Sequence, residues 1–466
     1  MNWEPVIGLE IHIHLKTRTK MFCRCEVAYS EPENTRTCPI CLAHPGSLPV
    51  PNAKAVEWTV KLGLALGCRI ADHAVFHRKQ YFYPDNPKAY QISQYDQPLC
   101  VDGRLVVPGA AGPTEIGIVR AHLEEDAAKN VHQGTAEGRI SGASATLVDF
   151  NRAGTPLVEI VTRPDLRSAE DARRFLQLLR QTIVELGISD AEMEKGSLRF
   201  DVNVSIRPEG SDELRTRTEL KNLNSFAFAA RANEREVKRQ AEIYESGGEV
   251  EQETLHFDPG SESAPPLRSK EEAQDYRYFP EPDLVPIEPT SELVVRARAE
   301  LPESPGARVM RLADELDFDL AADLVTSGRD VLYERVPGDR RAVANVLMNQ
   351  FAAGGVDPAA VNPDELAKLI EARSRIPRDR FLEAIAKSGE PGFSAEAYLG
   401  DGLVADAAEL GPIVDGILEA NPGQVEAYRG GKEGLLGFFV GQVMRETHGK
   451  ADPKVVNELL RKKLAA

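Results

Sequence analysis

The sequence contains no apolar run long enough to cross a bilayer. Even the apolar stretch from Val56 to Leu66 is interrupted by Glu57 and Lys61, whereas a spanning helix needs about 20 consecutive, mostly apolar residues. The first residues, Met1 to Pro5, show no basic region followed by an apolar core, so we expect no secretory signal. These absences predict a cytoplasmic protein without a membrane partner.

The sequence also has little positive charge. Its 73 acidic and 56 basic residues give a formal net charge of −17, which excludes indiscriminate binding to nucleic acid, because phosphate affinity comes from clustered Lys and Arg. The balance reverses near the end, where eight basic residues face four acidic ones from Tyr428 onward, a local charge of +4. An RNA-binding surface and a solvated helix face both fit this reversal, and charge alone favours the solvated face.

Three motifs of nucleotide binding and nucleophilic catalysis are absent. There is no Gly-x-x-x-x-Gly-Lys-Ser/Thr loop, no strand followed by Gly-x-Gly-x-x-Gly, and no Gly-x-Ser-x-Gly turn. A bound nucleotide would therefore be held mainly through a metal ion and side chains. The paired cysteines described below fit metal binding, which leaves no obvious cysteine nucleophile.

What the sequence does contain is a strand-rich first part of about 290 residues, followed by short amphipathic segments. Alternating apolar and polar residues predict strands at 6–15, 79–83, 116–124, 157–163, 198–207 and 214–222. Helices are predicted from Ala53 to Leu66, from Ser168 to Gly187 and from Ser225 to Gly247. The pattern is typical of an α+β fold with a mostly antiparallel sheet, followed by two all-α domains. We expect the domains to cover residues 1–292, 293–404 and 405–466.

Four of the six cysteines form two close pairs, Cys23-Arg-Cys25 and Cys38-Pro-Ile-Cys41, separated by twelve residues. In a reducing compartment such pairs are more often thiolate ligands than disulfides. Four sulfurs complete a tetrahedral zinc site with no open position, which is structural rather than catalytic. The sequence favours a zinc knuckle over residues 23–41, and the alternative is a loop with unmetallated cysteines.

The segment Gly8-Leu-Glu-Ile-His-Ile-His-Leu15 carries the most informative alternation. On a strand the apolar residues enter a core, and Glu10, His12 and His14 stand in a row on the other face. A carboxylate beside imidazoles is typical of metal binding or proton transfer. The plainer alternative, of about equal weight, is the polar outer face of an edge strand.

Several other predicted strands repeat this device. Their polar residues are Lys79, Tyr81 and Tyr83; Asp201 and Asn203; Glu219 and Lys221; and the run His122-Leu-Glu-Glu-Asp126. Brought together in one sheet, these strands predict a concave surface rich in carboxylates. Close carboxylates repel unless a cation lies among them, and Mg²⁺ is the usual choice when oxygen ligands dominate.

One unbroken block, Val148-Asp-Phe-Asn-Arg-Ala-Gly-Thr-Pro-Leu-Val-Glu-Ile-Val161, resembles the signature of the B subunits of tRNA-dependent amidotransferases. Further matches are dense over the first 290 residues and sparser around Gly437-Phe-Phe-Val-Gly-Gln442. They include Val6–His12, Tyr81–Ser93, His122–Asp126, Glu219–Ser225 and Asp275–Asp283. The resemblance implies a cradle-shaped catalytic domain, a helical domain and a tail domain that contacts tRNA.

The same resemblance implies an ATP-dependent carbon–nitrogen ligase with glutamine as nitrogen donor, active as part of a heterotrimer. ATP phosphorylates the side-chain carboxylate of misacylated Glu-tRNA(Gln) or Asp-tRNA(Asn), and ammonia then displaces the phosphate. An amidase A subunit releases this ammonia from glutamine, and a small C subunit braces the A and B subunits together. The implied cofactors are ATP, Mg²⁺ and a structural Zn²⁺. The synthetase that misacylates the tRNA is a further partner to consider.

Site residues also follow from the resemblance. Glu10, His12, Glu125 and Asp201 are expected to gather the metal, with Glu124 and Asn203 beside them. Lys79 and Tyr81 are expected to contact the nucleotide or the acyl phosphate. Glu125 is expected where the ammonia channel enters the pocket, and Cys23, Cys25, Cys38 and Cys41 are expected to hold zinc that is dispensable to the chemistry.

Two details of this expected ligand set depend on the three-dimensional structure. His14 is left out of it, because relatives are expected to carry other polar residues at that position. Strict alternation also puts Glu124 and Glu125 on opposite faces, so a metal-binding Glu125 requires the strand to bulge or end by residue 124.

Two other classes of protein compete with this interpretation. A non-catalytic RNA-binding scaffold has no use for adjacent carboxylates. A metal-dependent hydrolase requires a metal-bound water and would act without ATP or tRNA.

Overall fold

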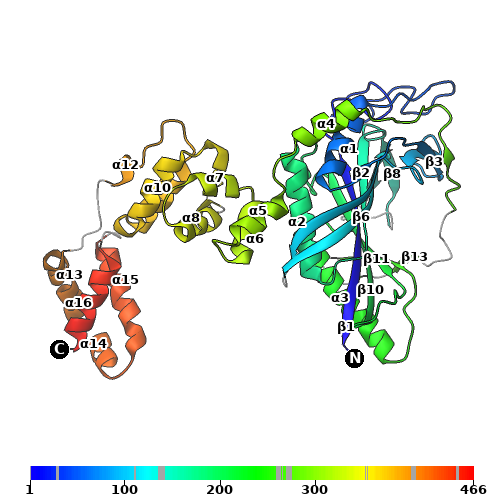
Figure 1. Cartoon of the computed structure of the whole chain (residues 1–466). Helices are drawn as coiled ribbons and strands as arrows, with labels where there is room; N and C mark the ends of the chain where they lie inside the picture. The colour runs from blue at the N-terminus through cyan, green and yellow to red at the C-terminus, as the bar shows by residue number, and fades with distance from the viewer. Residues whose placement is uncertain are drawn as a thin grey trace. The chain divides into compact units, whose positions relative to one another are not determined.

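The computed structural model divides into two compact units, Met1–Val309 and Met310–Ala466. It describes residues 2–27, 31–109, 112–134, 142–258, 264, 266–268, 275–351, 353, 355–399, 406–447 and 451–465. The predicted boundary between residues 404 and 405 lies outside these residues, and the domain limits stay predictions. Figure 1 colours the chain from the N-terminal sheet to the C-terminal helices.

A nine-stranded sheet forms the centre of the first unit. Its order is β13-β12-β11-β10-β1-β9-β6-β5-β2, and only the β11–β12 pair within it is parallel among the described strands. The bounds are β1 Trp3–His14, β2 Arg69–Ile70, β5 Cys100–Gly109, β6 Gly112–Glu125, β9 Pro156–Thr162, β10 Leu198–Pro208, β11 Thr218–Lys221, β12 Thr254–His256 and β13 Pro266–Arg268. The predicted α+β fold with a mostly antiparallel sheet is confirmed.

The first strand, β1, lies in the middle of this sheet, between β10 and β9. Leu9, Ile11 and Ile13 are almost completely buried, as the alternation predicts. An interior position removes the edge-strand alternative for the row of Glu10 and His12, because both sides of β1 are hydrogen-bonded to neighbours.

Three helices contact the strands of the large sheet: α1 Ala53–Ala65, α2 Ala169–Glu185 and α3 Phe226–Glu245. Each begins at a polar cap whose side chain accepts backbone N–H groups, namely Asn52, Ser168 and Ser225. Helices α2 and α3 also contact each other, and they lie side by side beside the strands in Figure 1. The helix predictions are therefore confirmed to within a few residues.

Two small sheets complete the first unit. One has the order β14-β3-β4, from Phe279–Pro280, Phe76–Gln80 and Tyr90–Gln94, and the other pairs β7 Lys129–Gln133 with β8 Ala145–Asp149. The strand predicted at 79–83 was wrong in its bounds, since β3 ends at Gln80. Beyond it the chain turns back, with the Asn86 side chain donating to the Tyr81 carbonyl oxygen, and Tyr83 does not continue the face of Lys79.

Helix α4 Ser291–Ala299 belongs to the first unit, and α5 Pro305–Leu312 includes the boundary between Val309 and Met310. The described elements of the second unit are helical. The α-helices are α6 Phe318–Thr326, α7 Asp330–Arg335, α8 Arg340–Val346, α10 Pro363–Ala372, α11 Arg378–Lys387, α12 Glu396–Leu399, α13 Ala407–Ala420, α14 Pro422–Arg429, α15 Leu436–Glu446 and α16 Pro453–Ala465. Short 3₁₀ or π turns occupy Leu347–Phe351, Pro358–Ala360, Arg373–Arg375 and Glu433–Leu435. Among the described helices, none is both long and apolar enough to cross a membrane.

Candidate active site on the polar face of the sheet

Polar side chains from five adjacent strands meet on one face of the large sheet. Glu10 stands opposite Asp201 of β10, and His12 stands opposite Glu159 of β9. Glu159 in turn stands opposite His122 of β6. This register brings together residues more than 100 positions apart. The sequence predicts that polar strand faces meet in one sheet, but not which residues stand opposite each other.

The first acid group consists of His12, Glu124 and Glu159. The His12 Nε2 atom lies 3.7 Å from Glu124 Oε1 and 3.5 Å from Glu159 Oε2, and one ligand atom from each residue lies within 4.8 Å of the others. An imidazole and two carboxylates form a plausible donor set for a divalent cation. Sequence reasoning missed Glu159, although it is the one charged residue in the apolar strand Pro156–Thr162 of the signature block.

Burial and charge set the protonation of this group. Burial and the neighbouring Glu159 raise the pKa of Glu124. Burial acts to lower the pKa of His12, but Glu159 and Glu124 outweigh it and raise that pKa. Burial lowers the pKa of His122, which adjoins the group, to about 4, so this imidazole is neutral near pH 7. The negative charges of Glu124 and Glu159 lie close together, and a cation bound between them would relieve their repulsion.

The second acid group consists of Glu10, Asp201 and Glu219. One oxygen of each lies within 4.8 Å of the others, and the Lys221 Nζ atom lies 2.5 Å from Asp201 and 2.9 Å from Glu219. Burial and the charges of Glu159, Glu219 and Asp201 raise the pKa of Glu10. Although burial opposes it, Asp201 raises the pKa of Lys221, so an ammonium already balances part of this group. Asn203 stands beside it, opposite Glu219 in the register.

Glu125 belongs to neither acid group. It is only 4% exposed, its Oε1 atom lies 2.6 Å from Lys88 Nζ, and the same oxygen accepts the backbone N–H of Ile92 over 3.0 Å. The register of β6 with β9 continues through Glu124 and Glu125 without a shift, so the two side chains lie on opposite faces. The expected single ligand set of Glu10, His12, Glu125 and Asp201 is therefore divided in the structure.

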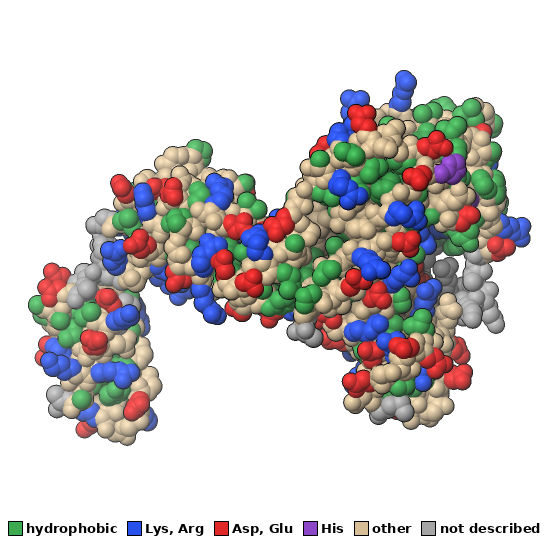
Figure 2. Space-filling model, viewed as in Figure 1, with side chains coloured by type: hydrophobic (Ala, Val, Ile, Leu, Met, Phe, Trp, Pro, Cys, Tyr) green, Lys and Arg blue, Asp and Glu red, His purple; other side chains and the backbone are tan. Residues whose placement is uncertain are grey.

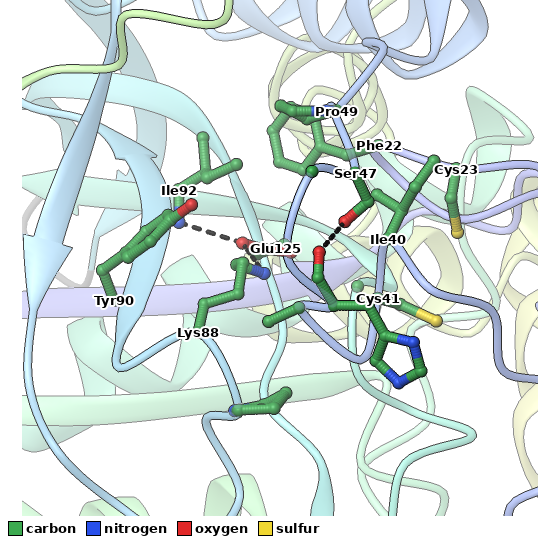
Figure 3. A pocket seen from close by; sticks show the side chains of 15 residues that line it. Phe22, Cys23, Ile40, Cys41, Ser47, Pro49, Lys88, Tyr90, Ile92 and Glu125 are labelled. Carbon is green, nitrogen blue, oxygen red and sulfur yellow. Dashed lines mark hydrogen bonds and ion pairs between the residues drawn. The ribbon is translucent and has the colours of Figure 1, made fainter.

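Glu125 instead lines a cavity of about 260 Å³ on the other side of the strand. Figure 3 shows its ion pair with Lys88 facing Cys41 and Phe22 across this pocket. The remaining lining includes Cys23, Ile40, His44, Pro49, Tyr90 and Gly154. The cysteine knuckle thus forms one wall of the pocket, and the Lys88–Glu125 pair forms another.

His14, the third residue of the predicted row, is 3% exposed, and its contacts stabilise the fold. Its Nε2 atom lies 2.6 Å from Asp126 Oδ2, which also accepts a hydrogen bond from Arg199 over 2.8 Å. Burial acts to raise the pKa of Asp126, but Arg199 and His14 outweigh it and hold that pKa well below its usual range. His14 is not a member of either acid group.

Lys79 and Tyr81 approach the first acid group from the β3 sheet. Burial acts to lower the pKa of Lys79, but Glu124 raises it, and its Nζ atom lies 4.8 Å from the centre of the Tyr276 ring. Burial and the nearby Asp85 and Glu124 raise the pKa of Tyr81. The Tyr276 ring lies 6.1 Å from the Tyr278 ring between ring centres, so both rings belong to one aromatic cluster beside the lysine.

The four predicted zinc ligands, Cys23, Cys25, Cys38 and Cys41, come together as free cysteines whose sulfurs lie within 4.8 Å of one another. The Cys38 and Cys41 sulfurs are 3.9 Å apart, close to the about 3.8 Å expected between ligands of a tetrahedral zinc–sulfur site. A hydrogen bond from Cys23 lowers the pKa of Cys41 to about 4, and Lys20 acts in the same direction. The donor set fits a structural zinc ion.

This sheet with its paired acid groups corresponds to a known catalytic domain. The family model described as the GatB/GatE catalytic domain matches residues 5–295, and the model described as the GatB domain matches residues 336–464. The chain belongs to the GatB family, the B subunits of the aspartyl/glutamyl-tRNA(Asn/Gln) amidotransferases.

The chain is similar over its whole length to curated members of this family. It is 46% identical to the B subunit of the aspartyl/glutamyl-tRNA(Asn/Gln) amidotransferase of Moorella thermoacetica, over 100% of both chains. It is 45% identical to that of Syntrophotalea carbinolica, over 99% of this chain and 98% of the relative, and 46% identical to that of Geobacter sulfurreducens, over 100% of both chains. The family resemblance seen in the sequence is thereby confirmed.

Proposed function

We propose that this chain is the component of a tRNA-dependent amidotransferase that activates and amidates the side-chain carboxylate of misacylated Glu-tRNA(Gln), Asp-tRNA(Asn) or both. The observation that carries the proposal is the adjacency of two acid groups on one sheet face, with Lys79 beside them. A scaffold that only binds RNA gains nothing from this arrangement, since clustered carboxylates repel phosphate.

The reaction has two balanced steps. A carboxylate oxygen of the misacylated residue attacks the γ-phosphorus of ATP, the bond to the β-phosphate oxygen breaks, and ADP leaves. Ammonia then attacks the carbonyl carbon of the acyl phosphate, the carbon–oxygen bond to phosphate breaks, and the nitrogen loses a proton. Both reactants of the first step are anions, so positive charge must offset their repulsion.

The residues of the two acid groups supply that offset in different ways. His12, Glu124 and Glu159 are suited to hold Mg²⁺, which when bound neutralises charge on the transferring phosphate. Lys221 supplies a fixed ammonium between Asp201 and Glu219. Glu10, placed opposite Asp201, would offer a further carboxylate oxygen to a cation bound at this group.

Lys79 and the tyrosine rings are suited to the nucleotide. The Lys79 ammonium, which interacts with the charges of Glu124 and Glu159, would attract the γ-phosphate of an ATP bound at these groups. The Tyr81, Tyr276 and Tyr278 rings present stacking faces beside it, and Tyr278 is stacked at 4.3 Å with Tyr95. We therefore assign Lys79 to phosphate and the rings to the purine.

Glu125 is assigned to the arrival of ammonia. The pocket that it lines with Lys88 lies directly behind the strand that carries Glu124 into the acid group. Ammonium has no free electron pair and must lose a proton before it can attack as ammonia. A carboxylate at this point is able to accept that proton. The nitrogen is supplied by a glutaminase A subunit, held in place with the help of a small C subunit, in keeping with the naming of the relatives as one component of an amidotransferase.

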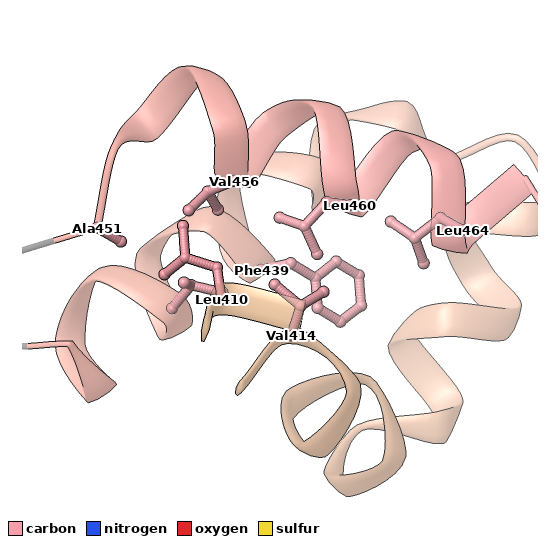
Figure 4. Close-up of a cluster of buried hydrophobic side chains, with 8 residues drawn as sticks. Leu410, Val414, Phe439, Ala451, Val456, Leu460 and Leu464 are labelled. Atoms are coloured by element: carbon pink, nitrogen blue, oxygen red, sulfur yellow. The ribbon is translucent and has the colours of Figure 1, made fainter. Parts of the chain in front are cut away.

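The last helices are assigned to tRNA. Helices α13, α15 and α16 enclose a separate core around Val414, Phe439 and Leu460 (Figure 4). Figure 2 shows Lys and Arg side chains on the visible face of this bundle, among acidic ones. The part of the chain from Tyr428 onward, which carries a local charge of +4, is suited to contact a phosphate backbone.

The test is co-expression with candidate A and C subunits, followed by amidation assays on both misacylated tRNAs. We expect amide formation that requires ATP, glutamine and the tRNA together. Hydrolysis by the chain alone, without ATP or tRNA, would instead support the metal-dependent hydrolase. Binding of tRNA with no amidation of either substrate would support the scaffold.

A further inference from the structure

Lys20 is completely buried inside the first unit, with an exposed fraction of 0%. Its Nζ atom donates a hydrogen bond to the Phe150 carbonyl oxygen over 3.1 Å and lies 3.7 Å from the Cys41 sulfur. None of the ion pairs between described residues joins Lys20 to an Asp or Glu. Burying an ammonium without a counter-charge is strongly unfavourable, and the Cys41 sulfur is the nearby atom able to carry negative charge.

A metal-bound knuckle provides that charge. Four thiolates around one Zn²⁺ leave a net charge of about −2, which the buried ammonium offsets in part. The backbone fixes Lys20 at this place, because its N–H donates to the Cys25 carbonyl oxygen over 2.9 Å. Lys20 is therefore tied to the knuckle both through its backbone and through its side chain.

The same lysine also reaches the signature block. Phe150, which accepts its side-chain hydrogen bond, donates its own N–H to Asn34 Oδ1 of the knuckle over 2.8 Å. Met21 donates to the Gly154 carbonyl oxygen over 2.7 Å, and Gly154 donates to the Asp126 carbonyl oxygen over 2.8 Å. These hydrogen bonds form a continuous path from the cysteines to the residue next to Glu125.

Gly154 shows how closely the segments pack. Its φ of +83° favours glycine, and a Cβ built there would lie 3.5 Å from Lys20 Cδ and 3.7 Å from Cys41 Cβ. Cys41 and Gly154 both line the pocket that contains Glu125 (Figure 3). A displacement of the knuckle would therefore change the shape of this pocket.

We propose that Lys20 is a positioning residue of the cysteine knuckle, whose ammonium offsets the charge of metal-bound Cys41 and fixes the knuckle as a wall of the Glu125 pocket. The proposal rests on the zinc assignment made above, and it is independent of the amidation chemistry. The competing explanation is that Lys20 serves only as the hydrogen-bond donor to Phe150.

Three substitutions separate these explanations in the complex with its A and C subunits. Lys20→Gln retains a hydrogen-bond donor without charge, Lys20→Arg retains the charge, and Lys20→Met removes both. Lys16→Met is the matched control, because Lys16 lies four residues away with its side chain 46% exposed and paired to Asp190. The measurement is zinc content, followed by the rate of zinc release to a coloured chelator under native conditions.

We expect Lys20→Gln and Lys20→Met to release zinc about tenfold faster than the unmodified complex, since partners of metal ligands contribute about 10- to 100-fold to metal affinity. Lys20→Arg and Lys16→Met should release it at the unmodified rate. Release from Lys20→Gln at the unmodified rate overturns the proposal, even where Lys20→Met fails to fold.

Hydrogen exchange of the unmodified complex provides a second measurement that needs no variant. Removal of zinc should speed amide exchange in residues 18–27, 31–50 and 148–155, and leave helix α1 unchanged. Equal exchange before and after removal overturns the link to the pocket. A complex that contains no zinc overturns this proposal and the zinc assignment together, while the amidation assay still tests the proposed function separately.

Discussion

Glu10 of β1 and Asp201 of β10 occupy directly opposed positions in the sheet, and the Lys221 ammonium lies 2.5 Å from the Asp201 carboxylate. Burial raises the pKa of Glu10 most, and the charges of Glu159, Glu219 and Asp201 raise it further, because like charges repel. The Lys221 ammonium thus offsets the negative charge of the second acid group, as a bound metal ion would offset that of the first.

Replacing Lys221 by Met should destabilise the chain, because three partly buried carboxylates lose their cation. We expect a loss of about 1–3 kcal/mol in the free energy of unfolding, the usual range for an unsatisfied buried polar group. Mg²⁺ at millimolar concentration should restore part of it. Urea unfolding with and without Mg²⁺ measures the effect, with the exposed Lys238→Met as control.

Glu159→Gln should strongly reduce ATP-dependent amidation and raise the Mg²⁺ concentration that amidation requires, because it removes a carboxylate from the first acid group. Glutaminase activity of the assembled complex should persist. The comparison is the Mg²⁺ concentration for half-maximal amidation in the variant and in Glu115→Gln, an exposed glutamate of β6. Unchanged amidation by Glu159→Gln would remove this residue from the proposed metal site.

Glu125→Gln should abolish amidation that depends on glutamine, with glutaminase activity still measurable. The substitution keeps the size of the side chain and removes the charge that pairs with Lys88. Assays of glutamine hydrolysis and tRNA amidation on the same preparation separate the two activities. Full amidation by the variant would refute the role of Glu125.

Asp126 should make the stability of the chain depend on acid pH. Its pKa in the folded chain lies below the ordinary 3.8, so it contributes stability above that value, which is lost as the pH falls toward the folded pKa. Asp126→Asn should therefore unfold more readily near pH 7 and lose less further stability on acidification. Urea midpoints from pH 7 to pH 3 test this, and the exposed Asp190→Asn should follow the unmodified curve.

Deletion of residues 405–466 should raise KM for tRNA far more than KM for ATP. The core of the last helices comprises residues of this region alone, so its loss should spare the sheet that holds the acid groups. Steady-state amidation at varied tRNA and varied ATP gives both constants. Equal increases in the two would withdraw the assignment of the tail to tRNA.

The strands and their polar residues were predictable because a period of two is a local property of the sequence. The row of Glu10, His12 and His14 was read from eight consecutive residues, and the buried apolar face of β1 confirms that alternation. The cysteine cluster was predictable for a similar reason, since its four residues lie within 19 positions.

The pairing of the strands was not predictable, because register is a relation between distant segments. Register joins Glu159 to His12 and leaves Glu125 on the far face with Lys88. The separate environments of Glu10 and His12, which are only two residues apart, likewise depend on which strand lies on each side. Glu159 carried one usable signal, a charge within an otherwise apolar strand.

The central place of β1 has a consequence for synthesis on the ribosome. The β1 segment is synthesised before both of its neighbours, β9 and β10, which follow roughly 150 to 200 residues later in the chain, so until then neither of its edges is covered. Until then an apolar strand with bare backbone groups is open to wrong partners, a hazard that long-range pairing brings to any nascent chain. Chaperone binding at the exit tunnel should therefore concentrate on the β1 segment.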